Sequence, residues 1–312
     1  MNMPVAQKNI LGRPMVATLS TDHLAHNVQV IQSWAPSAKI IAMVKSNGYG
    51  HGIRSVAKRL EGLVSWLGVA SINEALALRD SQIRAPLLLM EGVFSPEEYR
   101  YAAAYAFGVV IHNSQQVDWL EQAQCAPLAV WIKVDTGMGR LGFRAQEVDS
   151  VKQRLQLSGK VQGDVGIMSH FACASDKDHT LNALQINRFS QVRSGFKGPA
   201  SMCNSAGILN FPHAQFEYVR PGLALYGISP VDNKMASDHL LKPVMTLRSG
   251  IIAIRDCVQG DTIGYGADYV CSKAMRVVVI ACGYGDGYPQ TAPQGTPVLV
   301  AGQRCPLVGR VS

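Results

Sequence analysis

A regular alternation of apolar segments with amphipathic ones constrains the fold of this chain most strongly. Eight apolar, β-rich segments lie between residues 39 and 219, and helix signals separate most of them. Eight strand–helix units over roughly two hundred residues are typical of an α/β TIM (β/α)8 barrel. A doubly wound sheet is the alternative, but no GxGxxG follows the first strand. The predicted strands are 39–44, 66–70, 86–90, 108–111, 129–134, 165–169, 200–203 and 217–219, and the predicted helices are 21–34, 53–60, 73–79, one starting at 95–98, 114–122, 146–157 and 181–193.

The alternation ends after about Gly227, where strand-like segments follow one another between glycines and short polar turns. No amphipathic helix is evident there, which favours an all-β domain. The prediction is therefore a barrel over residues 1–240 and a C-terminal β domain over 241–312. The strands expected in the second domain are 243–255, 261–265, 275–282, 297–301 and 306–312.

Charge and cysteine content exclude several classes of protein. The formal net charge is +7, but no five basic residues are consecutive, so we expect no nucleic-acid partner. The seven cysteines are odd in number and show no CxxC spacing, which indicates reduced thiols and no metal site. Residues 1–10 lack the apolar core of an export signal, and no apolar run is long enough for a membrane span. These features predict a cytoplasmic protein with no membrane association.

One lysine stands out at the end of the first barrel strand. Residues 39–52 read KIIAMVKSNGYGHG, so Lys45 closes an apolar strand and a glycine-rich loop follows it. Loss of hydration at such a position favours the neutral, nucleophilic amine, which suits a Schiff-base lysine. The alternative is a structural lysine that extends to the barrel rim, and this stretch alone leaves both interpretations open.

Polar residues also follow the other predicted strands, where a barrel gathers its functional groups. Each has a structural interpretation by itself: an interior histidine, half of an ion pair, or a cap and turn. Their joint occurrence around one rim is harder to explain structurally. These residues are Lys133 to Arg140, His170, Asn204 with Ser205, and Arg220.

The chemistry of this set indicates a phosphate-bearing aldehyde cofactor. The Ser205 and Tyr49 hydroxyls and the amides near Gly222 are directional phosphate donors. Phosphate donors combined with an imine-forming lysine predict pyridoxal 5'-phosphate. Arg220 would face the pyridine nitrogen and, because a guanidinium keeps its proton, would leave that nitrogen unprotonated. The cofactor would then be a weak electron sink that favours quick reprotonation, as a racemase requires.

At this point the chain resembles the bacterial alanine racemases, a family of fold-type III pyridoxal-phosphate enzymes. The similarity runs through nearly the whole chain and rests on seven segments in the family order. They are AMVKSNGYGHG at 42–52, KVDTGMGRLG at 133–142, SHFA at 169–172, CNSAG at 203–207, RPGLALYG at 220–227, GYGADY at 264–269 and GYGDGY at 283–288.

The resemblance implies an activity and an assembly. The expected reaction is interconversion of L-alanine and D-alanine by two-base proton transfer on a pyridoxal-phosphate aldimine, supplying D-alanine for peptidoglycan. The expected assembly is a head-to-tail homodimer whose active sites are shared between subunits. Lys45 matches the lysine that holds the cofactor and acts as one base, and Tyr265 matches the second base, which comes from the partner subunit.

The resemblance also implies roles for the residues around these two bases. Arg220 matches the partner of the pyridine nitrogen, and His170 links it to Tyr265 in a chain whose positive charge would make the tyrosine a better base. Arg140 matches an arginine near the substrate carboxylate, Lys133 a lysine that is often carbamylated and positions that arginine, and Tyr284 a tyrosine of the entry corridor. The phosphate cradle corresponds to Tyr49, Asn204, Ser205, Gly222 and Leu223.

The chain departs from the family pattern at its end. Family members continue past the segment that matches 309–312, whereas the last strand predicted here runs to Ser312 without a closing turn. An open strand exposes unpaired backbone groups, so we expect an incomplete β domain and a less stable chain than a full-length relative. Three alternatives to an active alanine racemase remain: a truncated, weakly active or inactive fragment, a racemase of broader specificity, and a non-catalytic cofactor carrier on the same barrel. Such carriers lack the β domain, so Tyr265 favours the enzyme.

Overall fold

The structure is a computed structural model that describes residues 12–312. The segment for which the sequence predicts no export signal, residues 1–10, lies outside the described residues. The chain divides into two compact units, Leu19–Met245 and Thr246–Ser312 with the residues before Leu19, here named the barrel unit and the β unit. The sequence-based division placed everything before residue 240 in the barrel. The contacts group the strand β1 (Val16–Leu19), up to Thr18, with the β unit, because β1 pairs with β10 (Met245–Arg248).

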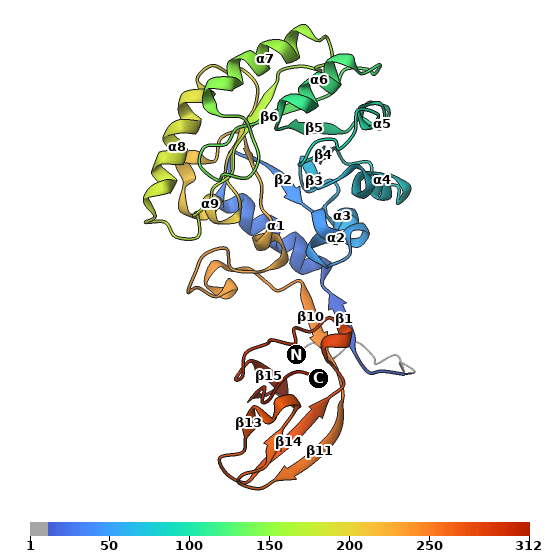
Figure 1. Ribbon diagram of the computed structural model, residues 1–312, viewed down its shortest axis with the longest axis vertical. Helices are drawn as coiled ribbons and strands as arrows, with labels where there is room; N and C mark the ends of the chain where they lie inside the picture. The colour runs from blue at the N-terminus through green and yellow to red at the C-terminus, as the bar shows by residue number, and fades with distance from the viewer. Residues whose placement is uncertain (1–11) are drawn as a thin grey trace. The chain divides into compact units, whose positions relative to one another are not determined.

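Eight parallel strands close into a barrel, which confirms the predicted TIM architecture (Figure 1). Each strand pairs with the next along the chain, and the last returns to the first through Lys39 and Tyr218. The strands are β2 (Lys39–Met43), β3 (Trp66–Val69), β4 (Leu87–Leu89), β5 (Gly108–Ile111), β6 (Val130–Lys133), β7 (Gly166–Met168), β8 (Ala200–Ser201) and β9 (Tyr218–Val219).

Helices lie outside the strands in Figure 1, and several begin where the sequence predicts. Ser20 caps the first helix by accepting a hydrogen bond from the His23 amide at 3.2 Å. The fifth helix begins at Glu98, later than predicted, because residues 95–97 form a turn first. The helices of this unit are α1 (Thr21–Trp34), α2 (Lys45–Tyr49), α3 (Ile53–Leu60), α4 (Ile72–Asp80), α5 (Glu98–Ala104), α6 (Ser114–Gln122), α7 (Val148–Leu157), α8 (Thr180–Arg193) and α9 (Ser205–Asn210), with 3-10 turns η1 (Ala145–Glu147), η2 (Pro212–Ala214), η3 (Leu223–Tyr226) and η4 (Ala236–His239).

Side chains fill the lumen of the barrel. Successive strand residues face opposite sides, so one set packs under the helices and the other fills the interior. The interior set is Ile41, Met43, Leu88, Met90, Val110, Trp131 and Met168. Gly166 makes room for the indole, because a Cβ there would lie 2.6 Å from Trp131. A packed lumen leaves the strand ends as the places where this barrel can bind a ligand.

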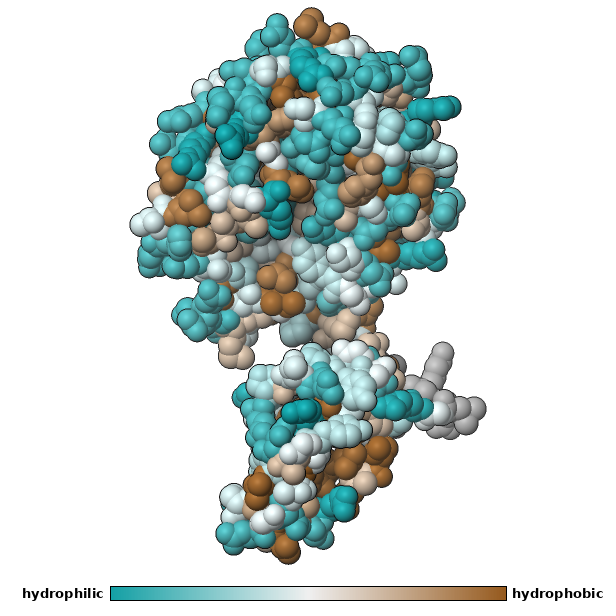
Figure 2. All heavy atoms as spheres, viewed as in Figure 1, coloured by the Kyte–Doolittle hydropathy of each residue, from teal (hydrophilic) through white to brown (hydrophobic). Residues whose placement is uncertain are grey.

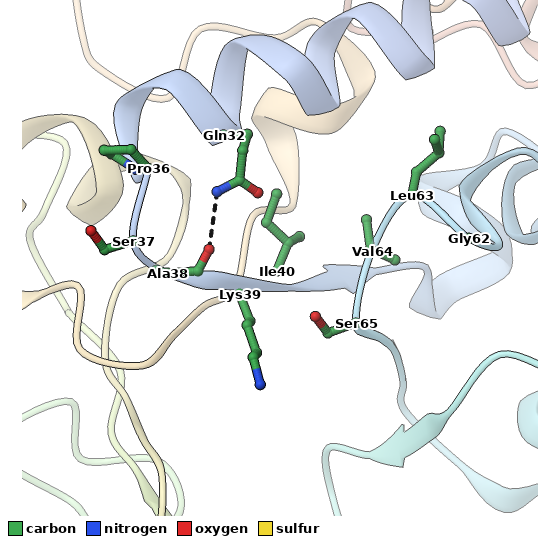
Figure 3. Close-up of a pocket in the computed structure, with 10 residues that line it drawn as sticks. All are labelled: Gln32, Pro36, Ser37, Ala38, Lys39, Ile40, Gly62, Leu63, Val64 and Ser65. Atoms are coloured by element: carbon green, nitrogen blue, oxygen red, sulfur yellow. Dashed lines mark hydrogen bonds between the residues drawn. The ribbon is translucent and has the colours of Figure 1, made fainter.

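A cavity of about 430 Å³ opens at the N-terminal end of β2, the end away from Lys45 (Figure 3). Residues 32–40 and 62–65 contribute its lining, and the Gln32 amide donates to the Ala38 carbonyl at 3.1 Å. The Lys39 ammonium lies 5.8 Å from the centre of the Tyr218 ring. In such barrels this end serves stability and the opposite end carries the chemistry, so the candidate site is sought at the other end.

The β unit contains short antiparallel pairs. β11 (Ile251–Cys257) pairs with β14 (Met275–Ile280), β12 (Thr262–Ile263) with β13 (Tyr269–Val270), and β15 (Pro297–Val300) with β16 (Gln303–Pro306). Two 3-10 turns, η5 (Tyr265–Ala267) and η6 (Tyr284–Asp286), lie between them. Apolar side chains remain on the surface of this unit (Figure 2), and Ile252 and Ile254 are 63% and 60% exposed.

The predicted final strand, 306–312, is wrong. The last strand ends at Pro306, and residues 307–312 run without strand pairing. The Ser312 carbonyl accepts a hydrogen bond from the Tyr284 amide at 3.1 Å, and Val311 is buried. The apolar residues of this segment therefore pack against their own unit without forming a ladder. Across residues 12–312, we find no helix with the length and apolar character needed to cross a membrane.

Candidate active site

Lys45 follows β2 at the start of a left-handed turn. Ser46, Asn47 and Gly48 have φ angles of 55°, 55° and 64°, a conformation that costs energy for the first two because they carry a Cβ. Glu74 of α4 stabilises the turn, since its Oε1 accepts from the Ser46 and Asn47 amides at 2.7 and 3.4 Å. The strained turn fixes the backbone from which the lysine side chain projects.

The expectation that Lys45 is sealed from water is wrong. Its side chain is 33% exposed, and its Nζ lies 3.8 Å from Oε1 of Glu91. Glu91 follows β4 at the same end of the barrel. The sequence analysis missed this carboxylate, although the rule that selected the other residues, a polar side chain just after a barrel strand, also applies to it.

Arg220 lies buried between the ends of β7 and β8. Its exposed fraction is 2%, and its terminal nitrogens donate to the Ser201 hydroxyl at 2.5 Å, the Met202 carbonyl at 3.3 Å and the Ser169 carbonyl. Burial lowers the pKa of Arg220 to about 10, so the guanidinium stays charged at neutral pH. In the described part of the chain Nε–H makes no hydrogen bond and remains a free donor.

His170 is the neighbour of Arg220 and is neutral. Its Nδ1 lies 3.3 Å from Nη2 of Arg220 and must accept from it, so the ring proton is on Nε2. Burial, and then the positive charge of Arg220, hold the pKa of His170 well below its usual range. The buried Gln185 of α8 fixes the His170 backbone by donating to its carbonyl at 2.9 Å. The positive charge expected along the Arg220–His170 link therefore resides on Arg220.

Lys133 and Arg140 belong to the loop after β6. Lys133 is 7% exposed, and burial, followed by the charges of Arg220, Arg140 and Lys45, lowers its pKa to about 7. Its ammonium is therefore only partly populated at neutral pH. The Asp135 carboxylate shapes the loop by accepting hydrogen bonds from the amides of residues 137–139 at 2.9 to 3.1 Å. Arg140, which follows, is exposed.

The predicted phosphate cradle gathers at the ends of β8 and β9. The Ser205 hydroxyl accepts from the Gly222 and Ala224 amides at 2.9 and 3.2 Å. Gly222 lies so close to Tyr49 that a Cβ there would be 2.5 Å from the tyrosine hydroxyl. Burial raises the pKa of Tyr49, so its hydroxyl stays protonated and can donate. Tyr49 stacks on Tyr226 with ring centres 5.0 Å apart.

Asn204 and Leu223 lie beside this cradle in structural positions. Asn204 caps α9, since its Oδ1 accepts from the Gly207 amide at 2.9 Å. Leu223 begins η3 and is 41% exposed, so its backbone amide and not its side chain is the group suited to an anion.

The two remaining predicted residues, Tyr265 and Tyr284, belong to the β unit. Tyr265 is 58% exposed at the start of η5, between Gly264 and Gly266, whose φ angles are +79° and +76°. Tyr284 begins η6 and is 51% exposed. Both hydroxyls thus project from short turns on a surface of this unit.

The barrel and its strand ends define a class of protein. It is a (β/α)8-barrel enzyme with a lysine at the mouth, a buried arginine–histidine pair, a hydroxyl-and-amide cradle and a β domain after the barrel. The family model described as alanine racemase, N-terminal domain, matches residues 19–230, and the model for the C-terminal domain matches residues 244–312. The chain belongs to the alanine racemase family.

Individual relatives agree with this assignment. The chain is 44% identical over 302 residues to the alanine racemase of Coxiella burnetii (strain RSA 331 / Henzerling II), with 95% of this chain and 83% of the relative covered. The alanine racemase of Vibrio vulnificus (strain YJ016) is 43% identical over 307 residues, covering 97% of this chain and 82% of the relative. The biosynthetic alanine racemase of Pseudomonas aeruginosa matches in structure with a TM-score of 0.93 and 38% identity, covering 96% of this chain and 84% of that one.

These comparisons bear on the alternatives. Residues 244–312 match the C-terminal family domain, so a barrel-only carrier does not describe this chain. The relatives share the name alanine racemase, which favours neither a racemase of broader specificity nor an inactive fragment.

Proposed function

We propose that this chain interconverts L-alanine and D-alanine with pyridoxal 5'-phosphate held at Lys45, as a cytoplasmic source of D-alanine for peptidoglycan. The observation that carries the proposal is the buried, charged Arg220 hydrogen-bonded to a neutral His170 at the barrel end that also carries Lys45. A buried guanidinium with an unused Nε–H needs an acceptor, and a pyridine nitrogen is one.

The residues present fit the cofactor. Protonated Tyr49, the Ser205 hydroxyl and the Gly222 amide are neutral, directional donors for a phosphate, and a side chain at Gly222 would fill their cradle. When bound, pyridoxal phosphate supplies the electron sink that acidifies the α-hydrogen of an amino acid. Arg220 would keep the ring nitrogen unprotonated, because a guanidinium does not give up its proton. A weak electron sink favours rapid return of the proton.

Two bases complete the assignment. Lys45 would hold the cofactor and exchange a proton on one face of the α-carbon, and Tyr265 would exchange a proton on the other face. His170 would orient the residues around Arg220. Arg140 would bind the substrate carboxylate, Lys133 would support it through the loop after β6, and Tyr284 would line the route of entry.

The first experiment tests the lysine and the reaction together. Purified protein is loaded with pyridoxal phosphate, treated with borohydride and digested, while a second sample is assayed for conversion of L-alanine to D-alanine by chiral chromatography. We expect the cofactor to be fixed to the peptide that contains Lys45, and racemisation to be lost in Lys45→Ala. Labelling at Lys45 without conversion of alanine would reject the racemase.

The second experiment tests sharing of the site between two copies of the chain. A dimer formed from one Lys45→Ala chain and one Tyr265→Phe chain would carry one site with both changes and one intact site. After mixed refolding, random pairing should restore about a quarter of the wild-type activity. No recovery in a mixture that contains the mixed dimer would contradict the assignment of Tyr265 to the partner subunit.

A further inference from the structure

Two cysteines flank the segment that carries Tyr265. Cys257 is the last residue of β11, and Cys271 directly follows β13. Between them lie the β12–β13 hairpin and the turn η5 with the tyrosine. All seven cysteines are free thiols, and the proposed reaction uses none of them.

Backbone hydrogen bonds hold the two cysteines at the base of this segment. The Cys271 amide donates to the Asp261 carbonyl at 2.8 Å, and its carbonyl accepts from the Gly260 amide at 2.8 Å. Asp261 belongs to the turn that follows Cys257, because its carboxylate accepts from the Val258 amide at 2.9 Å. The side chains meet as well, and the thiol of Cys271 shares a hydrogen bond with that of Cys257.

The two thiols differ in accessibility. Cys271 is 1% exposed, whereas Cys257 is half-buried. Burial, and then the neighbouring Cys257, raise the pKa of the Cys271 thiol, which keeps it protonated at neutral pH. A dissolved oxidant therefore reaches Cys257 first, with Cys271 behind it as the resolving thiol.

We propose that Cys257 and Cys271 are a modification site, at which peroxides or small-molecule disulfides produce a reversible intramolecular disulfide. With hydrogen peroxide, the Cys257 sulfur attacks one oxygen, the O–O bond breaks, and a sulfenic acid and one water result. The Cys271 sulfur then attacks the Cys257 sulfur, the S–S bond forms, and the hydroxyl leaves with the thiol proton as a second water. Two thiols are oxidised by two electrons, and the peroxide is reduced.

The disulfide would close a covalent ring around residues 258–270. Without it, this segment is held by the pairs Thr262↔Val270 and Ile263↔Tyr269 and by an ion pair between Arg310 and Asp268 at 2.7 Å. A ring of this size restricts opening of the segment. Where the proposed function holds, oxidation thereby restricts the turn that presents the second base; the disulfide itself does not depend on that function.

The sequence offers a direct chemical test. Arg255 and Lys273 flank the site without another lysine or arginine between them, so trypsin releases both cysteines in one peptide, 256–273. The full chain is reduced, freed of reductant, treated with hydrogen peroxide, alkylated and digested without reductant. We expect that peptide to be two hydrogens lighter, unalkylated, and restored by dithiothreitol. After cleavage next to Tyr265 with chymotrypsin, its two halves should remain joined.

Variants and a structural readout separate this from unspecific oxidation. Cys257→Ser should abolish the linkage, while the matched control Cys305→Ser, a half-buried cysteine on β16, should retain it. Chymotryptic cleavage of the native protein within 258–270 should slow on the order of tenfold or more after oxidation. A Cys257 that ends as a sulfinic acid, or linked to another cysteine, would overturn the proposal. Neither readout uses racemase activity, so failure here is distinct from failure of the proposed function.

Discussion

Replacing Gly222 by alanine should damage the phosphate cradle without unfolding the barrel. The φ angle of Gly222 is −125°, so the backbone accepts a side chain. The new Cβ would lie 2.5 Å from the Tyr49 hydroxyl and 3.1 Å from Cζ of the same ring. To reach an ordinary contact distance of 3.4 Å, the hydroxyl must move by about 0.9 Å. Stacking on Tyr226 resists that movement.

The magnitude follows from the hydrogen bond that is displaced. An O–H donor that moves by this amount leaves the usual range of about 2.5–3.0 Å for such bonds. A hydrogen bond to a charged acceptor contributes about 1.5–3 kcal/mol. The dissociation constant for pyridoxal phosphate should therefore rise by about 10- to 150-fold.

The assay is an absorbance titration of the apoprotein with pyridoxal phosphate, next to urea unfolding followed by circular dichroism. Gly195→Ala is the matched control, because its new Cβ meets only the Val192 carbonyl at 3.7 Å and the Asp149 carboxylate at 3.8 Å. In a Tyr49→Phe background the clashing hydroxyl is gone, so Gly222→Ala should cost less than it does in the wild type. Affinity of Gly222→Ala within about threefold of the wild type, or fully additive effects in the double variant, would refute the reasoning.

Three further outcomes are expected. Burial lowers the pKa of Lys133 to about 7, so between pH 7 and 10.5 the unfolded chain binds more protons than the native one, and the free energy of unfolding should rise by up to about 1.4 kcal/mol per pH unit. Urea unfolding at pH 7 and pH 9 should show this rise in the wild type and not in Lys133→Met. The lowered pKa of His170 acts at acid pH, where only the unfolded chain takes up the proton; below about pH 6.5 the wild type should lose more stability than His170→Asn, as thermal unfolding at pH 5 and 7.5 would measure. Gly227→Ala combines a φ of +78° with a Cβ placed 2.0 Å from the Lys242 carbonyl, and should lower the unfolding free energy by about 2–4 kcal/mol, whereas an unchanged urea midpoint would contradict the strain.

Local signals predicted much of the fold. The bounds of α3 (Ile53–Leu60) and α6 (Ser114–Gln122) match the prediction, because caps and apolar periodicity act within one or two turns. The strand-end rule selected Lys45, Lys133 and Arg220 because parallel strands of a barrel end at one rim. The final strand failed for a related reason: an apolar segment becomes a strand only where a partner backbone is available, and the residues after Pro306 have none among those described.

The sequence by itself determined the barrel, the residues at the strand ends and the family. Periodicity, turn chemistry and the order of the seven segments are all properties of neighbouring residues. Only the tertiary structure decided the electrostatic state of the site, since burial and charge depend on residues far apart in the chain. It left Lys45 partly exposed opposite Glu91, lowered the pKa of Lys133, made His170 neutral and placed the Cys257 and Cys271 thiols in contact.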